Sequence, residues 1–353
     1  MLSGSKTVRI VLCFCLGILL SGLLFACQPS ENQVSVDDDC YLIEHAAGTT
    51  CVPNTVERLV TLDVVTFESA IALGIKPVGT TGLERLSSLS EDLENVADIG
   101  QSDKPNLESI LSLNPDLILG IEDFASVPYD QVSQIAPTVL FKFEHSGLWK
   151  ELFRDCSRAL NREGIGQQAM EGYRQRIQDF RQRFEAQAEQ TDISDFQVSV
   201  LRVYPDAVNF YFRDSFPGVV LNDAGFARPA FQDIDAAEAK SRYQNPIQAS
   251  ISMERLDQAD ADVLFVWTAE DEEKAIEAAQ KRWETLQQNA IWQTLEVVQQ
   301  EKAYFVPSYW IGAGPLAADA MIDDLFKYIV DDEQINDASS RRNMRQTSKL
   351  YDG

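Results

Sequence analysis

Positive charge and histidine are scarce in this chain of 353 residues. The 30 Lys and Arg residues face 55 Asp and Glu residues, so the formal net charge is −25, and there are only two histidines. Such an acidic chain argues against binding nucleic acid and against electrostatic adhesion to anionic lipid. With His45 and His145 alone, a histidine-based metal site is not expected. An anionic ligand would need a local cluster of arginines.

Catalytic motifs are also missing. The sequence contains no Gly-x-Ser-x-Gly segment, no phosphate-cradling loop and no clustered His/Cys metal set. Gly312 and Gly314 precede a predicted helix, but the rest of a dinucleotide-binding fingerprint is absent. We therefore expect a binding protein that is not an enzyme, with no catalytic residues, no cofactor and no metal site of its own.

Long apolar runs are absent except at the N-terminus. Lys6 and Arg9 precede an apolar run at 10–25, which ends in Ala26-Cys27. This pattern is typical of a secretory signal peptide, and a cysteine directly after the small residue is typical of bacterial lipoproteins. An uncleaved signal anchor is the alternative, but roughly 16 residues fall short of the ~20 that span a bilayer. We predict a signal peptide over 1–27, lipidation of Cys27 and an extracytoplasmic protein anchored to the cell membrane on its periplasmic side.

Of the six cysteines, three lie within residues 1–27. Cys40 and Cys51 are close in sequence, and outside the cytoplasm such a pair is expected to form a disulfide across a hairpin. A loop this short adds about 2–3 kcal/mol of stability in the chain-entropy model. Cys156 lies on an apolar helical face, which predicts a buried free thiol.

The part that follows Cys27, roughly 325 residues, is longer than a single core usually supports, so we expect two domains. Short apolar runs alternate with helical patterns, which predicts α/β architecture with mainly parallel sheets in two copies. The chain then divides into a flexible tether (28–39), an N-terminal lobe (40–145), a helical segment (146–192), a C-terminal lobe (193–330) and a disordered tail (331–353).

One long helix is predicted between the lobes. Apolar residues recur at spacings of three or four at Ala169, Tyr173, Ile177, Phe180, Phe184 and Ala188. This pattern predicts an amphipathic helix of ~24 residues, ~36 Å long. Because a rigid helix joins the lobes, we expect little relative movement between them.

An internal repeat relates the two halves. Residues 106–119 and 252–265 align without a gap as a capping residue, a glutamate, a helical segment, an aspartate and a strand. Asn106 and Ser252 are good N-cap residues. The other matched pairs are Glu108 with Glu254 and Asp116 with Asp262.

These segments resemble the substrate-binding proteins of ABC importers for ferric siderophores and cobalamin, particularly the iron-siderophore branch. Residues 58–79 are similar to its opening strand–helix–strand unit, 45–53 to its entry hairpin and 310–325 to its closing loop and helix. The resemblance covers about residues 40–330. It implies a helical-backbone periplasmic-binding-protein fold, in which two lobes are bridged by one rigid helix and the ligand lies between them. It also implies a monomer that serves a membrane ABC permease dimer.

The segment 198–216 is the first candidate for ligand binding. Arg202, Tyr211 and Arg213 combine positive charge with aromatic walls, and guanidinium groups donate charge-assisted hydrogen bonds to carboxylate, hydroxamate or catecholate oxygens. In the resembling family this segment lines the cleft, and an arginine at the position of Arg202 contacts the iron-bound ligand. For Arg213 a surface ion pair with Asp214 is an equally open alternative.

Three further residues are candidates for the same cleft. Tyr309 and Trp310 follow a predicted strand, and ligands in open α/β sheets bind beyond the carboxyl ends of strands. The alternative is that Trp310 belongs to the core of its lobe. Arg85 could supply a positive contact from the first lobe, or it could be an exposed helical arginine.

Glu108 and Glu254 each fall in the first turn of a predicted helix. A carboxylate there complements the helix dipole by about 0.3–1 kcal/mol, which accounts for either glutamate alone. The resemblance implies a further role, because the corresponding glutamates sit on the two lobe tips and meet permease arginines. Paired acidic tips would steer docking.

The resulting expectation is a lipoprotein that binds a ferric siderophore, with hydroxamate or citrate–hydroxamate types favoured because 202–216 looks most like that subgroup. Iron would arrive already chelated. A cobalamin or haem protein on the same fold is the alternative, although the positions of His45 and His145 in the sequence speak against an axial haem ligand. A surface hydrolase or adhesin is disfavoured by the missing motifs.

Overall fold

The computed structural model describes residues 39–83, 93–122, 128–187, 192–270 and 272–331. The predicted signal peptide with Cys27, almost all of the tether and the tail, and Arg85 lie outside this part of the chain. Residues 1–40 and 41–353 form separate units, and the described helices and strands belong to the second apart from Cys40, which begins the first strand. Within the described ranges, no helix is both long and apolar enough to cross a bilayer.

The N-terminal half is built on a parallel sheet with the strand order β5-β4-β3-β8-β9. Its strands are β3 (Leu59–Thr61), β4 (Gly79–Thr80), β5 (Ala97–Asp98), β8 (Leu117–Ile121) and β9 (Thr138–Phe141). Helices α2 (Val64–Ala72), α3 (Leu107–Ser112) and α4 (Tyr129–Val132) connect them. Two small pairs complete this half: β1 (Cys40–His45) with β2 (Gly48–Pro53), and β6 (Gly100–Gln101) with β7 (Lys104–Pro105). Cys40 and Cys51 form a disulfide, and Cys156 is buried and free, so both cysteine predictions are confirmed.

The C-terminal half is built on a mixed sheet with the order β12-β11-β10-β13-β14. Its strands are β10 (Val198–Val203), β11 (Val208–Tyr211), β12 (Gln248–Ser250), β13 (Val263–Trp267) and β14 (Ala303–Phe305). β13 pairs in parallel with both β10 and β14, whereas β11 is antiparallel to β10 and β12. The antiparallel pairing of β10 with β11 follows from the short turn at 204–207, because a parallel pair needs a much longer crossover. The predicted α/β class with parallel sheets is confirmed, with these antiparallel strands added.

Helices cover this second sheet. They are α7 (Phe216–Ala224), α8 (Ala236–Tyr243), η4 (Met253–Ala259), α9 (Glu273–Gln287), α10 (Ala290–Thr294), α11 (Glu296–Gln299), η5 (Ser308–Ile311), α12 (Pro315–Leu325) and η6 (Phe326–Val330).

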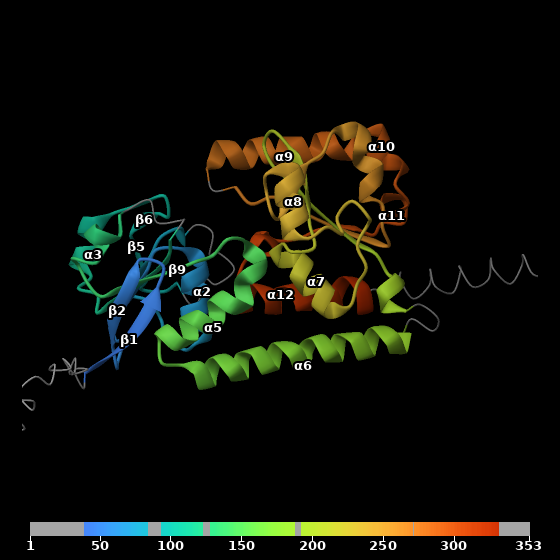
Figure 1. Cartoon of the computed structure of the whole chain (residues 1–353). Helices are drawn as coiled ribbons and strands as arrows, with labels where there is room; N and C mark the ends of the chain where they lie inside the picture. The colour runs from blue at the N-terminus through green and yellow to red at the C-terminus, as the bar shows by residue number, and fades with distance from the viewer. Residues whose placement is uncertain (1–38, 84–92, 123–127, 188–191, 271, 332–353) are drawn as a thin grey trace, which may run out of the picture. The chain divides into compact units, whose positions relative to one another are not determined.

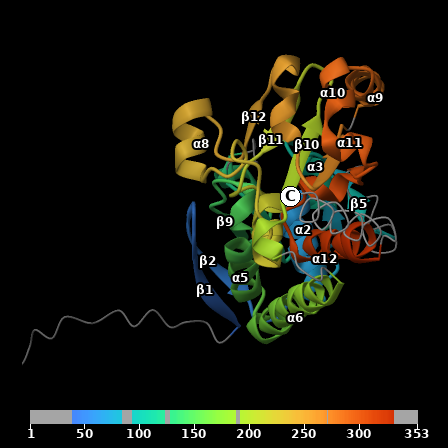
Figure 2. The same cartoon turned by 90° about the vertical axis from the view of Figure 1, so that its right-hand side faces the viewer.

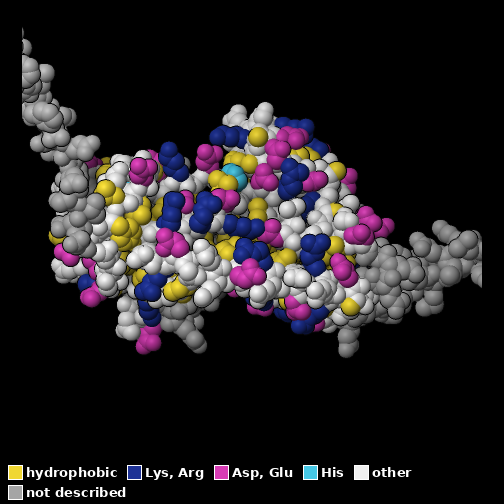
Figure 3. Space-filling model, turned by 60° about the horizontal axis from the view of Figure 1, so that its bottom comes forward, with side chains coloured by type: hydrophobic (Ala, Val, Ile, Leu, Met, Phe, Trp, Pro, Cys, Tyr) yellow, Lys and Arg dark blue, Asp and Glu magenta, His cyan; other side chains and the backbone are white. Residues whose placement is uncertain are grey.

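The predicted long helix is α6 (Glu163–Gln187), with 25 residues. It buries Tyr173, Ile177, Phe180 and Phe184 as the spacing predicts. It packs against α5 (Trp149–Ala159) from the first half and against α7 and α12 from the second, so one straight element supports both (Figures 1 and 2). Along the side of the molecule on which α6 lies, Lys and Arg side chains alternate with Asp and Glu (Figure 3).

Polar contacts tie α6 to its neighbours. The Asp223 carboxylate on α7 accepts from the Tyr173 hydroxyl at 2.6 Å and pairs with Lys150 on α5. Arg176 pairs with Asp319 at 3.1 Å and also with Asp323, both on α12. These contacts cross from one half to the other and resist sliding of the helices.

The internal repeat has a physical basis in its two aspartates. Asp116 precedes β8 and accepts from the backbone N–H of Arg58, which precedes β3, at 3.0 Å. Asp262 precedes β13 and accepts from the backbone N–H of Gln197, which precedes β10, at 2.9 Å. In both halves the aspartate therefore anchors the start of the neighbouring parallel strand.

The helices of the repeat differ. Asn106 caps α3, since its Oδ1 accepts from the Ser109 N–H at 3.1 Å. Ser252 makes no such bond, and the segment after it is a 3-10 helix with a non-helical residue, Arg255. The predicted N-cap at Asn106 is confirmed. Ser252 also occupies the N-cap position, but its side chain makes no capping hydrogen bond.

Candidate functional site

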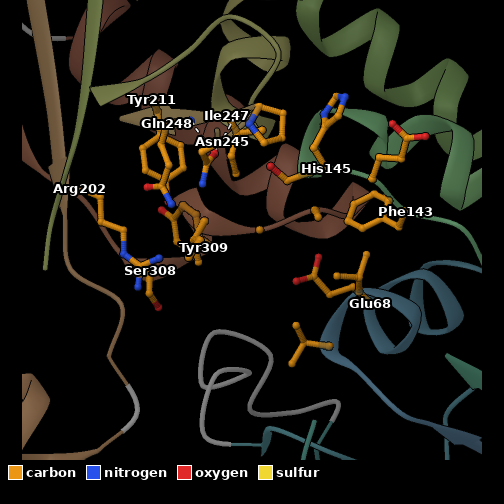
Figure 4. A pocket seen from close by; sticks show the side chains of 18 residues that line it. Glu68, Phe143, His145, Arg202, Tyr211, Asn245, Ile247, Gln248, Ser308 and Tyr309 are labelled. Carbon is orange, nitrogen blue, oxygen red and sulfur yellow. Dashed lines mark hydrogen bonds between the residues drawn. The ribbon is translucent and has the colours of Figure 1, made fainter. Parts of the chain in front are cut away.

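A cavity of about 390 Å³ lies where the two sheets approach each other, within the range typical of ligand pockets. It is assembled from α2, the loop after β9, strands β10 and β11, the approach to β12, and η5 with the loop after it. Polar side chains that line it include Glu68, His145, Arg202, Tyr211, Gln248 and Tyr309 (Figure 4).

Arg202 is the cation of the pocket wall. It lies near the end of β10 and is only 7% exposed. Its Nη2 donates to the Ala269 carbonyl at 2.7 Å and to Glu270 Oε1 at 3.2 Å, and its guanidinium lies 4.0 Å from the centre of the Tyr204 ring. Nε is buried and has no hydrogen-bond partner among the described residues. An unsatisfied buried donor costs about 1–3 kcal/mol, which a ligand acceptor could recover.

Tyrosines form the aromatic part of the wall next to Arg202. Tyr211 is 2% exposed, and its ring packs edge-on against Trp267 at 4.9 Å. Burial raises the pKa of the Tyr211 phenol, and the neighbouring Arg202 only partly counters this. The phenol therefore stays protonated and able to donate. The Tyr204 hydroxyl donates to Gln248 Oε1 at 2.9 Å and so links two residues of this wall.

Tyr309 and Trp310 take different positions although they are adjacent. The Tyr309 hydroxyl donates to Asp324 Oδ2 at 2.8 Å, and Tyr309 lines the cavity. Trp310 is 0% exposed, donates from Nε1 to the same oxygen at 2.8 Å, and packs 4.4 Å from the ring of Phe265. Trp310 is a core residue that holds η5 against α12.

The structure thus brings Arg202, Tyr211 and Tyr309 together but leaves two other candidates outside the lining. Trp310 is in the core. Arg213 pairs instead with three aspartates: Asp233 at 3.1 Å, Asp235 at 3.6 Å and Asp214 at 3.7 Å. It follows β11, where the chain turns toward the acidic N-terminus of α8. The alternatives raised for Trp310 and Arg213 describe their positions better than cleft lining does. Arg85 lies outside the described residues.

Glu68 was missed as a pocket residue. It belongs to α2, is 9% exposed, and accepts one long hydrogen bond, from the Ala317 N–H on α12 at 3.4 Å. Burial raises the pKa of its carboxyl to about 7, and the Ala317 bond only partly offsets this. The sequence did contain one indication of its role, because Glu68 is the only charged residue of helix α2.

One of the two histidines lies in the pocket, and the other lies in the predicted hairpin. His45 lies in the β1–β2 hairpin, where its Nε2 bonds the Thr50 hydroxyl at 2.9 Å. His145 lines the cavity, so its position in the sequence is no reason to discount haem. No group of three His, Cys, Asp or Glu side chains in the described part of the chain could hold a metal ion.

Glu108 and Glu254 are both exposed, in the first turns of α3 and η4. Each half therefore presents one glutamate at the matched position of the repeat. Their proposed contact with a permease stays a prediction.

Comparison with known proteins places the chain in a family. The family model for periplasmic binding protein matches residues 59–310, most of the chain. The chain belongs to the periplasmic binding protein family. Proteins of this family and the relatives below are binding proteins, not enzymes, and their two-lobed fold is the one described here.

Two curated relatives of this periplasmic binding protein come from Bacillus subtilis. The probable siderophore-binding lipoprotein YfiY is 29% identical over 92% of this chain and 98% of its own length. The Fe(3+)-citrate-binding protein YfmC is 26% identical over 81% and 86%, respectively. Among solved structures, Staphylococcus aureus SirA complexed with staphyloferrin B has a TM-score of 0.70 and 25% identity, covering 82% of this chain and 98% of SirA.

Proposed function

We propose that this periplasmic binding protein captures a ferric siderophore in the pocket beside Arg202 and delivers it to a membrane ABC permease. The observation that carries the proposal is the cavity that Arg202 lines together with Tyr211 and Tyr309. One fixed cation with aromatic walls suits an oxygen-rich chelate with a bulky surface. The names of the curated relatives support the same ligand class.

Hydroxamate or citrate–hydroxamate chelates are the favoured types. The described lining holds one arginine and two carboxylates, Glu68 and Glu144, so a chelate with little negative charge is accommodated better than a strongly anionic one. Iron is cargo that arrives inside its chelator, so the protein need not supply metal ligands. Cobalamin and haem have no observation in their favour beyond the place of His145, and they serve as comparison ligands.

Delivery would use features at three places. A lipid on Cys27 would confine the monomeric protein to the membrane that holds its permease. Glu108 and Glu254 would face arginines on the two halves of a permease dimer and orient the complex. The helix α6, with its ties to α5, α7 and α12, would limit lobe movement to small shifts during loading.

A titration tests the proposal. Residues 28–353 are titrated with ferric hydroxamate, citrate and catecholate chelates, cobalamin and haem, while tryptophan fluorescence reports on Trp267 behind the pocket wall. We expect quenching by a ferric siderophore, weakened by Arg202→Ala but not by the matched control Arg213→Ala. If no ferric siderophore quenches, the function is wrong. If Arg202→Ala binds like wild type, the assigned residue is wrong.

A further inference from the structure

The pocket carries opposite charges on its two sides. Glu68 enters from α2 in the first half and Arg202 from β10 in the second. Figure 4 shows the Glu68 carboxylate pointing into the space toward Tyr309, with Arg202 farther away on the opposite side of the pocket. A ligand that fills this space would meet a cation at one end and a carboxylate at the other.

The Glu68 carboxylate is held in place but poorly satisfied. The Ala317 N–H bond at 3.4 Å is at the limit for hydrogen bonding. Gly314 approaches so closely that a Cβ there would lie 2.6 Å from Glu68 Oε2, so α12 fixes the side chain from behind. Arg202, the cation of the described lining, is already paired with Glu270. A buried carboxylate without a cation is costly, and a cationic group on a ligand would relieve that cost.

We propose that Glu68 determines specificity for ferric chelates that carry a hydrogen-bond-donating cationic group, such as a free primary ammonium, on the side away from Arg202. This inference rests on the proposed function. The chelate oxygens face Arg202, Tyr211 and Tyr309. The ammonium faces Glu68. Charge-assisted hydrogen bonds are about twice as strong as neutral ones, so the charge on the arm, and not its length alone, sets the preference.

Other charged groups near Glu68 are engaged elsewhere. On α2, the N-cap Asp63 accepts from the backbone N–H of Thr66 at 2.8 Å and of Ile121 at 3.0 Å. On α5, Lys150 pairs with Asp223. On α12, Asp319 and Asp323 pair with Arg176, and Asp324 accepts from Tyr309 and Trp310. Two titratable groups in the lining on the same side remain, Glu144 and His145. A test must separate Glu68 from these two.

A matched pair of ligands makes that separation. Ferrioxamine B carries a free ammonium on a trishydroxamate chelate, and its N-acetyl derivative keeps the chelate but loses the charge. Calorimetric titration of the wild-type protein near pH 8 should give about tenfold tighter binding of ferrioxamine B. Glu68→Gln should bring the ratio of the two affinities close to one. Glu44→Gln, which removes an exposed carboxylate from β1, should leave the ratio unchanged.

The pH dependence gives a second readout, which begins with the wild-type protein. Because burial raises the pKa of the Glu68 carboxyl to about 7, this group is charged near pH 8 and neutral near pH 5.5, while the ligand ammonium stays charged throughout. The wild-type ratio should fall toward one at the lower pH. The ratio in Glu68→Gln should stay flat, which removes Glu144 and His145 as the cause.

Three results would overturn the proposal: equal wild-type affinities for the two chelates, a preference that persists in Glu68→Gln, or no binding of either chelate. The siderophore panel distinguishes these from failure of the function itself. If other ferric siderophores bind while this pair shows no preference, the function stands and the role of Glu68 falls.

Discussion

Replacing Arg202 by methionine should lower both the free energy of unfolding and the affinity for the ligand, and each loss has its own structural cause. The side chains of Arg202 and Glu270 are 9% and 16% exposed, and their ion pair spans 3.2 Å. Removing one partner of a buried pair costs 3–5 kcal/mol, and the partial exposure of Glu270 suggests the low end, about 3 kcal/mol. The binding loss comes from the Arg202 guanidinium, where a charged hydrogen bond to the ligand is worth about 1.5–3 kcal/mol, or roughly 10- to 150-fold in affinity.

The double variant Arg202→Met with Glu270→Gln separates the two effects. Without a stranded carboxylate, it should recover most of the free energy of unfolding measured by urea denaturation. Its affinity for the ferric siderophore, measured by fluorescence titration, should stay as low as that of Arg202→Met. If the double variant regains both stability and affinity, Arg202 serves only as the structural partner of Glu270, and its assignment as a ligand donor is refuted.

Three further predictions follow. Burial raises the pKa of the Glu68 carboxyl to about 7 in the folded chain, whereas it is near the ordinary value of 4.5 when unfolded, so the folded state holds an extra proton between these values. The free energy of unfolding should therefore fall, by up to roughly 3 kcal/mol, as pH rises from about 4.5 to 7, and denaturation of Glu68→Gln should show this fall removed. Glu108→Lys or Glu254→Lys should abolish most iron uptake by cells while siderophore affinity stays unchanged; normal uptake by both would contradict the docking role. Cys40→Ser should lower the free energy of unfolding by about 2–3 kcal/mol, an effect that a reductant should reproduce in the wild type.

Elements with a strong local signal were predictable. The spacing of Tyr173, Ile177, Phe180 and Phe184 identified α6 because an amphipathic period depends only on the helix itself. The matched aspartates of the repeat marked the starts of β8 and β13, although their hydrogen bonds reach neighbouring strands that are distant in the chain. Ser252 takes the N-cap position as predicted but makes no capping bond, and the helix that follows is 3-10, a geometry that sequence alone does not distinguish from an α-helix.

The pocket was only partly predictable because it joins segments distant in the chain. Arg202 and Arg213 look alike in sequence, but the end of β11 directs Arg213 to the aspartates before α8. Trp310 lies in the core, where its Nε1 donates to Asp324, 14 residues later in the chain. The place of Glu68 in the lining depends on how α12 packs on α2, which no local pattern reports.

The most direct test of the account is a crystal structure of the protein loaded with a ferric siderophore that the panel identifies, with iron located by its anomalous scattering. The account predicts one iron position within the cavity lined by Arg202, Tyr211 and Tyr309, with a chelate oxygen at hydrogen-bond distance from the Arg202 guanidinium. Iron outside that cavity, for example in the cavity of about 580 Å³ lined by Phe231 and Tyr243, would contradict it.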